Sequence, residues 1–351
     1  MNVGIVGYSQ SGKTLLFRAV AGAASKGDVA SVPVPDPRLD FIVSRLNPKK
    51  HTFATIALHD DLDSVQRGGK ALTQRFLDAA RRMELLLHVV RAFDFAAGSE
   101  AGGGDPKGDV RALDAELMLA DLQVAESRLD SLSRHPESRQ PGKSEYLERA
   151  FLERAKGKLE AEGPLRTLEL DDEEAALARG LQLVSVKPLA VAINVDEAQA
   201  TRPTEASGAL VESLTRNGVP AFAVCSKLEA EIAELEPADR PAFLESLGLS
   251  EPASAVLMRA VYEAMGLITF FTTVGNEVRA WPLRIGSTAL KAAAAVHTDI
   301  ARGFIRAEVV HFADFEACGS LSASHDAGKM RLEGKEYVVQ DGDILMIRNK
   351  T

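Results

Sequence analysis

The stretch Gly7-Tyr8-Ser9-Gln10-Ser11-Gly12-Lys13-Thr14 stands between a short apolar run and a helical pattern. The run from Asn2 to Val6 indicates a buried strand, and the pattern from Lys13 to Val20 indicates the beginning of a helix. The stretch matches G-x-x-x-x-G-K-[S/T], in which glycines let backbone N–H groups converge on phosphate oxygens at a helix N-terminus. A strand, this loop and a helix in succession predict a P-loop that binds a nucleoside triphosphate.

The polar residues of this loop have separate predicted tasks. We expect the Lys13 ammonium, a solvated charge until phosphate arrives, to reach the β- and γ-phosphates and to be the one catalytic side chain. The Thr14 hydroxyl is expected to bind Mg²⁺. The predicted nucleotide contacts in this loop are Gln10, Ser11, Gly12, Lys13, Thr14 and Leu15.

Three further apolar runs indicate strands of the same sheet. They cover residues 85–90, 188–193 and 219–224, and helical segments separate them. Continuous apolar runs of this length are typical of parallel strands that are buried on both faces. The sequence therefore predicts an α/β fold with a doubly wound, mostly parallel sheet.

Between the second and third strands the pattern becomes that of two charged helices. Two apolar stripes flank a break at residues 135–143, which contains two prolines and a glycine. This pattern predicts an antiparallel helical hairpin inserted into the sheet domain, although two ordinary surface helices would give similar short stripes. The stripes are Leu113, Leu117, Ala120 and Val124 before the break, and Leu147, Phe151, Ala155 and Leu159 after it.

From about Gly266 the chain becomes rich in short strand patterns. These patterns cover residues 277–285, 304–312, 330–332 and 337–339, with turns at 333–335 and 340–343 and a helix near 288–297. We therefore expect three parts. They are a nucleotide-binding domain at 1–110 and 180–265, a helical arm at 111–179, and a compact strand-rich domain at 266–351.

Composition places limits on the compartment and on the partners. The net charge is −9, so the whole surface is not expected to coat nucleic acid. Cys225 and Cys318 are the only cysteines, which favours a reducing compartment and excludes a zinc site built from cysteines. The N-terminus lacks a signal-peptide pattern, and no run of about eighteen apolar residues offers a membrane span. We expect a cytoplasmic protein without a membrane partner, and the oligomeric state stays open.

Several segments outside the P-loop resemble one known family. Taken together, they resemble the Obg-like ATPases, a branch of the translation-factor-related P-loop GTPases, and the resemblance covers nearly the whole chain. It implies a C-terminal β-grasp (TGS) domain, a coiled-coil arm, magnesium-dependent hydrolysis of ATP, and the ribosome or ribosomal RNA as a partner. The segments are 34–40 (VPDPRLD), 194–197 (NVDE), 225–231 (CSKLEAE), 277–281 (EVRAW), 297–299 (HTD), 303–309 (GFIRAEV) and 338–343 (VVQDGD).

The resemblance also implies a preference for one base. Most P-loop GTPases have N-K-x-D where this chain has Asn194-Val195-Asp196-Glu197. By resemblance, Asn194 and the Val195 backbone meet adenine, with Glu197 in place of the aspartate that binds guanine, which favours ATP over GTP. Ser226 is an expected contact on the next nucleotide loop. An alternative interpretation is that Asn194 only caps the end of its strand.

Some positions depart from the family pattern. Asp60 keeps the carboxylate expected to bind the metal, but Asp63 replaces a glycine whose N–H meets the γ-phosphate. The segment 21–31 is short and has no threonine to complete the magnesium shell, and the second switch is reduced to 66–70. Gln10 replaces an asparagine that many members associate with potassium. These departures favour slow hydrolysis.

Two other functions stay open at this point. One is a nucleotide-gated binding module that no longer hydrolyses its ligand, and the other is an ordinary GTPase, which the segment 194–197 disfavours. The histidines at 59 and 88 are expected to be structural, and none is assigned to catalysis. For a large partner, the sequence offers a set of basic residues in its last third, although solvated surface charges would look the same. This set is Arg279, Arg284, Lys291, Arg302 and Arg306.

Overall fold

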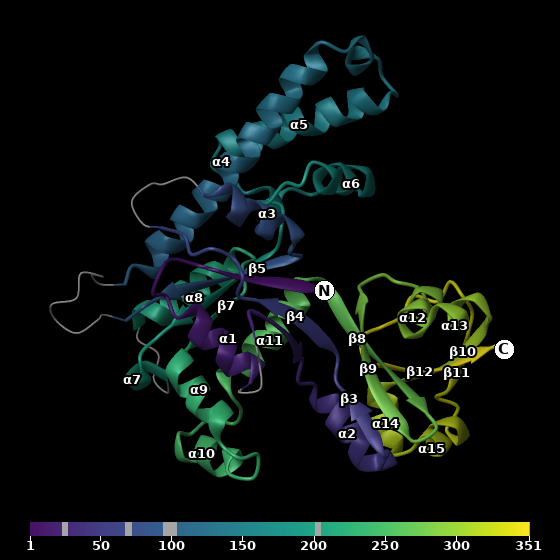
Figure 1. Cartoon of the computed structure of the whole chain (residues 1–351). Coiled ribbons are helices and arrows are strands. Elements are labelled where there is room, and N and C mark those ends of the chain that lie inside the picture. Colours follow the sequence, from purple (N-terminus) through teal and green to yellow (C-terminus); the bar gives the residue numbers. More distant parts are fainter. Residues whose placement is uncertain (23–26, 67–71, 94–103, 201–204, 351) are drawn as a thin grey trace. The chain divides into compact units, whose positions relative to one another are not determined.

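The computed structural model describes residues 1–22, 27–66, 72–93, 104–200 and 205–350, without the side chains of 205 and 206. Its contacts divide the chain into two compact units (Figure 1). Unit 1 comprises Met1–Ala30 and Ala57–Leu257, and unit 2 comprises Ser31–Ile56 and Met258–Thr351. This division differs from the expected boundaries, because residues 31–56 pack with the C-terminal part of the chain. No described helix is long and apolar enough to cross a membrane.

A six-stranded sheet in the order β2-β4-β1-β5-β6-β7 positions the P-loop. Its central strand β1 (Asn2–Val6) is parallel to β4 (Thr55–His59) on one side and to β5 (Leu85–Arg91) on the other. β5, β6 (Leu189–Asn194) and β7 (Ala221–Val224) continue the parallel arrangement. Every residue of β5 and β6 is buried, as the continuous apolar runs predict. The predicted doubly wound parallel sheet is confirmed.

Helices join these strands. α1 (Lys13–Ala21) follows β1 and packs against α9 (Ser226–Glu234), which follows β7. The loops before both helices therefore meet at the carboxyl ends of the strands, where ligands bind in open α/β sheets. Further elements before residue 265 and outside the arm are β2 (Val29–Pro33), α3 (Gln74–Arg82), α7 (Glu197–Ala200), α8 (Glu205–Arg216), α10 (Arg240–Ser246) and α11 (Ala253–Ala264).

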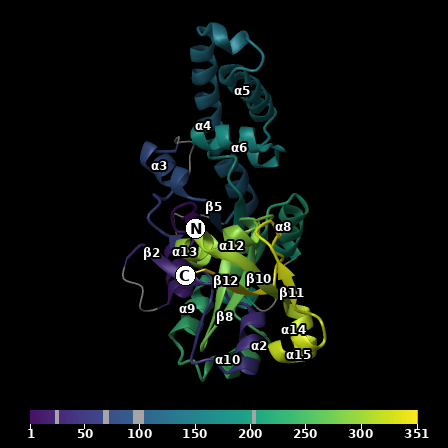
Figure 2. The ribbon, with the colours of Figure 1, turned by 90° about the vertical axis from the view of Figure 1, so that its right-hand side faces the viewer.

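The inserted helical hairpin is confirmed. α4 (Pro106–Ser133) and α5 (Ser144–Glu160) run side by side in both views, joined through the short 3₁₀ helix Pro136–Arg139 (Figures 1 and 2). The 3₁₀ helix Leu165–Thr167 and α6 (Asp172–Gly180) then lead back to the sheet.

The buried stripe of the hairpin differs from the predicted one. α4 buries Asp121 and Ala125, whereas the expected positions Ala120 and Val124 are only partly buried. Asp121 accepts hydrogen bonds from the Val184 N–H (2.8 Å) and from the N–H and hydroxyl of Ser185 (2.7 and 2.6 Å). The predicted stripe contains only apolar residues and therefore leaves out Asp121, a polar residue that is buried because its carboxylate is hydrogen-bonded. In α5, Leu147 is 43% exposed and Leu152 is fully buried.

Unit 2 contains a second six-stranded sheet, in the order β11-β10-β12-β8-β9-β3. β8 (Leu267–Val274) and β9 (Glu277–Arg284) form an antiparallel pair, and β12 (Asp343–Asn349) lies between β8 and β10 (Phe304–His311). β8 and β12 are absent from the predicted strands, and the expected strand at 337–339 makes only an isolated bridge. The remaining elements are β3 (Lys50–Thr52), β11 (Arg331–Glu333), α2 (Pro37–Leu46), α12 (Ala289–Val296), α13 (Thr298–Arg302), α14 (Phe312–Cys318) and α15 (Leu321–Asp326).

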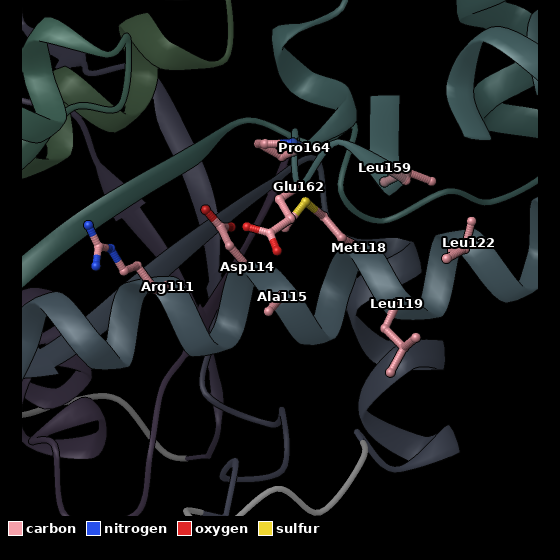
Figure 3. A pocket seen from close by; sticks show the side chains of 9 residues that line it. All are labelled: Arg111, Asp114, Ala115, Met118, Leu119, Leu122, Leu159, Glu162 and Pro164. Atoms are coloured by element: carbon pink, nitrogen blue, oxygen red, sulfur yellow. The ribbon is translucent and has the colours of Figure 1, made fainter. Parts of the chain in front are cut away.

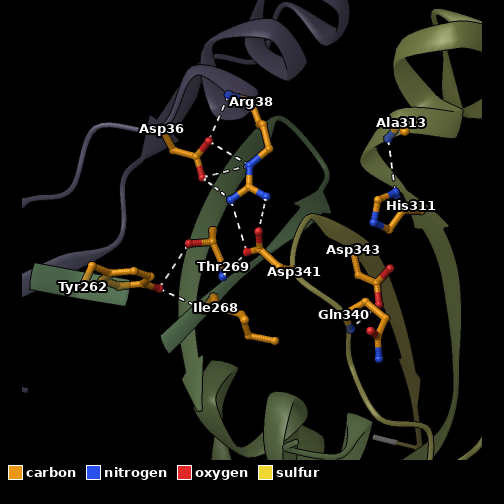
Figure 4. A network of polar contacts seen from close by, with 10 residues as sticks. All are labelled: Asp36, Arg38, Tyr262, Ile268, Thr269, His311, Ala313, Gln340, Asp341 and Asp343. Carbon is orange, nitrogen blue, oxygen red and sulfur yellow. Dashed lines mark hydrogen bonds and ion pairs between the residues drawn. The ribbon is translucent and has the colours of Figure 1, made fainter. Parts of the chain in front are cut away.

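A polar network shows why residues 31–56 belong to unit 2 (Figure 4). The Arg38 guanidinium lies between two carboxylates, at 2.8 Å from Asp36 and 2.6 Å from Asp341. Asp341 also accepts a hydrogen bond from the Thr269 N–H at 2.9 Å. In addition, β3 pairs in parallel with β9. The middle of the segment between the P-loop helix and Asp60, which comprises α2 and β3, is therefore tied to the C-terminal part of the chain.

Candidate nucleotide-binding site

The P-loop backbone requires glycine at two positions. Gly7 has φ +150° and Gly12 has φ +97°, a region that side chains rarely adopt. A Cβ atom at Gly7 would lie 2.4 Å from the Val89 carbonyl oxygen, and one at Gly12 would lie 2.1 Å from Nδ2 of Asn194. The loop is therefore packed against two neighbouring strands as well as curled.

Lys13 is buried inside the curl of this loop. Its side chain donates hydrogen bonds to the carbonyl oxygens of Gly7 (3.0 Å) and Tyr8 (3.2 Å) and to the Ser64 hydroxyl (2.8 Å). The expectation of a solvated charge is wrong, because only 7% of the residue is exposed. Burial lowers the pKa of Lys13, and the Asp60 carboxylate opposes this shift. All three hydrogen-bond acceptors are neutral, so a phosphate oxygen would be the better partner.

The two predicted metal ligands lie next to each other. The Thr14 hydroxyl donates a hydrogen bond to the Asp60 carboxylate, and the Asp60 N–H donates to the Asp28 carbonyl oxygen at 2.7 Å. Burial raises the pKa of Asp60, while the Thr14 hydroxyl and the Lys13 ammonium oppose that shift. One hydroxyl and one carboxylate form the donor set that Mg²⁺ completes with phosphate oxygens and water. These residues therefore fit a magnesium ion.

The segment after Asp60 contacts the P-loop directly. The Val65 N–H donates to the Gly7 carbonyl oxygen and the Ser9 N–H to the Val65 carbonyl oxygen, both at 3.2 Å. Asp63 faces α3, where its carboxylate lies 3.6 Å from Nε of Arg75. Ser64, the partner of Lys13, is a contact that the sequence analysis missed, because no motif marks it. Residues 67–71 and 23–26, which carry much of the two expected switch segments, lie outside the described residues.

On the base side, Asn194 connects two loops. Its Nδ2 donates to the Ser11 carbonyl oxygen at 2.9 Å, and its Oδ1 accepts from the Ser226 N–H at 3.0 Å. These contacts reach far beyond the end of its own strand, which disfavours the interpretation of Asn194 as a simple cap. The Val195 N–H donates to the Val224 carbonyl oxygen at 3.0 Å. A contact between Asn194 or Val195 and adenine stays a prediction.

Comparisons with known proteins agree with this geometry. The chain is 37% identical to the ribosome-binding ATPase YchF of Bacillus subtilis and 35% identical to that of Escherichia coli O157:H7. These matches cover 99% and 97% of both chains. This chain belongs to the YchF family of Obg-like ATPases. The YchF-GTPase_C model, described as a protein of unknown function (DUF933), matches residues 267–350. The structure of the Schizosaccharomyces pombe YchF GTPase matches 99% of this chain and 97% of its own, with a TM-score of 0.87 at 26% identity.

Two buried hydroxyl groups of the site have no hydrogen-bond partner within the described part of the chain. They belong to Ser11 and Ser226, both predicted nucleotide contacts. The Ser226 hydroxyl lies 3.6 Å from the position of a Cβ atom at Gly12. Buried polar groups are normally paired, so these hydroxyls indicate space arranged for a polar ligand.

Glu197 and Gln10, also expected at the site, are exposed. Glu197 pairs with Nζ of Lys227 at 2.9 Å, which places an ion pair at the beginning of α9. Gln10 has φ +65° and belongs to the P-loop turn. Leu15 is 40% exposed on α1. Nothing in the described residues brings these three side chains together, and their contacts with a nucleotide stay predictions.

The positions of the histidines agree with the expectation that they have structural roles. His88 is fully buried in β5, and burial lowers its pKa to about 3, so the ring is neutral at physiological pH. Nε2 of His59 lies 3.3 Å from Oδ1 of Asn2. His297 belongs to unit 2, where its Nδ1 accepts from the Asp299 N–H at the beginning of α13.

A separate hollow lies at the base of the helical arm (Figure 3). It has a volume of about 710 Å³, and the side chains along one face of α4 form most of its lining. Met118 and Leu122 give it an apolar floor, while Asp114 and Glu162 bring carboxylates to it. It does not include any residue of the P-loop.

Proposed function

We propose that this chain binds ATP with Mg²⁺, hydrolyses it slowly, and acts as a ribosome-associated regulator in the cytoplasm. The observation that carries the proposal is the arrangement of Lys13 inside the P-loop with the Thr14–Asp60 pair beside it. The relatives named as ribosome-binding ATPases support the partner and the reaction. The proposed role is that of a nucleotide-dependent switch, with a helical arm at residues 111–179 and a TGS-like β-grasp domain at residues 266–351.

The chemistry assigned to the site is attack of water on the γ-phosphate, achieved by positioning and charge stabilisation. Thr14 and Asp60 would hold magnesium, which neutralises charge on the phosphates when bound. Lys13 exchanges its neutral acceptors for phosphate oxygens and stabilises the charge that develops as the bond to the leaving group lengthens. No side chain of the described site is placed as a general base.

ATP is the proposed nucleotide because, compared with N-K-x-D, the segment 194–197 has Val195 in place of the lysine and Glu197 in place of the aspartate that binds guanine. A site arranged for one base leaves polar groups unpaired with the other, which costs about 1–3 kcal/mol for each group. Competition titration in magnesium should therefore show tighter binding of ATP than of GTP. A preference for GTP would contradict the assignment.

Lys13→Ala tests the phosphate site itself. Removing a charged hydrogen-bond donor should weaken ATP binding by about 1.5–3 kcal/mol, roughly 10- to 150-fold in Kd. The fold should survive, because the mutation also removes a cation that burial disfavours. Calorimetry measures the affinity and thermal unfolding checks the fold. An unchanged Kd in a folded variant would exclude this P-loop as the nucleotide site.

Ribosome association is tested by sedimentation of the full chain with ribosomes in ATP, ADP and no nucleotide. We expect co-migration that depends on the nucleotide. Absence of co-migration in all three states would contradict that part of the proposal while leaving ATP binding intact.

A further inference from the structure

The tip of the helical arm differs in charge from the helices that carry it. We call residues 133–144 the arm tip. It has three basic side chains, one histidine and one acidic side chain. The adjoining helical residues 106–132 and 145–160 carry seven basic and ten acidic side chains. In a chain of net charge −9, the tip is therefore a local positive site at the end of an acidic arm.

The charges of the tip are available to a ligand. Every residue of 133–144 is exposed except Ser138. Within the described residues, neither Arg139 nor Lys143 has an ion-pair partner within 4.0 Å, whereas Arg134 pairs with Asp130. By contrast, arginines on the helices are engaged, as in the pairs Arg128–Glu148 and Arg154–Glu174.

Glu145 is the acidic group that follows the tip directly. A hydrogen bond from its own backbone lowers its pKa most, followed by one from the Ser144 hydroxyl at 2.9 Å. Lys143 and His135 contribute weaker electrostatic effects to the same shift. The carboxylate is therefore held locally and does not form an ion pair with the tip.

The hairpin holds the tip in a defined shape. Two ion pairs join its helices, from Arg128 to Glu148 at 2.6 Å and from Lys156 to Glu126 at 2.9 Å. Below the tip, Leu132 and Phe151 belong to a buried apolar cluster. Within the tip, the buried Ser138 hydroxyl donates to the His135 carbonyl oxygen at 2.7 Å. Arg139 therefore projects from an ordered 3₁₀ turn, and Lys143 lies at the N-terminal end of α5.

We propose that the arm tip binds the phosphate backbone of RNA, with Arg139 and Lys143 as its principal contacts. This inference rests on the proposed association with ribosomes and assigns the RNA contact to one surface. Arginine and lysine side chains that have no ion-pair partner on an exposed projection can form charged hydrogen bonds with phosphate oxygens. Such contacts do not depend on the base sequence.

The C-terminal basic residues do not offer the same advantage. Residues 267–350 carry ten basic and ten acidic side chains. Arg279 already lies over the Trp281 ring, at 3.9 Å from its centroid, and Arg302 lies 3.5 Å from Asp299. Lys291 and Arg306 are exposed, but the domain around this set lacks the local net positive charge of the arm tip.

The test compares two variants of equal charge. Arg139→Gln with Lys143→Gln removes two charges from the tip, and Lys107→Gln with Arg179→Gln removes two exposed charges from the ends of α4 and α6. Binding to ribosomes and to a purified ribosomal RNA fragment is measured between 50 and 200 mM salt. The slope of log K against log[salt] should fall by about one for each lost phosphate contact, so by about two in the tip variant. The control variant should keep the wild-type slope.

The outcomes separate this inference from the proposed function. If wild type binds ribosomes and the tip variant binds them equally well, the inference is overturned and the proposed function stands. An equal loss of ribosome binding in the tip variant and the control variant also overturns the inference and leaves the proposed function standing. Loss of ribosome binding in the tip variant, with no binding of the RNA fragment by wild type, identifies an acidic protein partner and overturns RNA. Tip-dependent binding to RNA without binding to ribosomes overturns only the ribosome assignment. ATP affinity and the unfolding temperature should equal wild type in both variants.

Discussion

At the scale of single residues, Asp63 shows how one neighbour changes an expectation taken from sequence. A carboxylate beside the γ-phosphate would repel it, and loss of one electrostatic donor typically costs about 2.7–4 kcal/mol in the barrier. In the structure this carboxylate lies 3.6 Å from Nε of Arg75, a partner that no motif predicts. The penalty should therefore be smaller than the sequence alone suggests.

A double-mutant cycle tests this interpretation. Asp63→Gly should raise the single-turnover rate of ATP hydrolysis by about tenfold, below the 10²–10³ of a full donor effect. Arg75→Ala should lower the rate when Asp63 is present, because the carboxylate loses its cation, and should have no effect in the Asp63→Gly background. Equal effects of Arg75→Ala in both backgrounds would contradict this role of Arg75.

His88 makes a prediction about acid stability. Its pKa falls to about 3 through burial, with a smaller contribution from Lys13, from an ordinary value of 6.5. The unfolded chain therefore binds the proton first, so stability is full above pH 6.5 and is lost as the pH falls toward 3. The slope from this residue is about 1.4 kcal/mol for each pH unit. Denaturant unfolding of His88→Leu should show a shallower pH dependence than wild type, and identical slopes would contradict the assignment.

At the scale of elements, the sequence predicts what continuous or periodic apolar patterns encode. β1, β5, β6, β7 and the hairpin follow from such patterns. β8 does not, because Thr269, Thr272 and Thr273 interrupt its apolar run. β12 begins with the buried Asp343, which accepts from Tyr337 and from the Gln340 N–H and therefore resembles a turn residue in sequence.

The register of the hairpin gives a prediction at the same scale. The sequence places Leu147 in the buried stripe, but it is 43% exposed, whereas Leu152 is fully buried. Leu152→Ala should therefore destabilise the protein by about 2–5 kcal/mol. Leu147→Ala, the matched control, should change stability by no more than about 0.5 kcal/mol. Chemical denaturation monitored by far-UV circular dichroism measures both, and equal losses would contradict the observed register.

At the scale of the whole molecule, the chain order and the compact units do not coincide. Residues 31–56 lie in sequence between the P-loop helix and the metal-binding candidate Asp60, yet they pack in unit 2. No local pattern encodes this, because the contacts join positions about three hundred residues apart, as Arg38 and Asp341 do. Sequence-based boundaries therefore assign α2 and β3 to the wrong compact unit.

This arrangement predicts that the C-terminal part cannot fold well by itself. A fragment of residues 258–351 lacks β3, which pairs with β9, and Phe41, whose ring lies 5.7 Å from that of Phe312. It also leaves Asp341 without Arg38. We expect the fragment to unfold without a cooperative transition, and a fragment that joins residues 31–56 to it through a flexible linker to recover one. In the full chain, Arg38→Ala should cost about 1–3 kcal/mol, less than additively with Asp341→Ala. Cooperative unfolding of the shorter fragment at the midpoint of the longer one would show that residues 31–56 contribute nothing to the fold of unit 2.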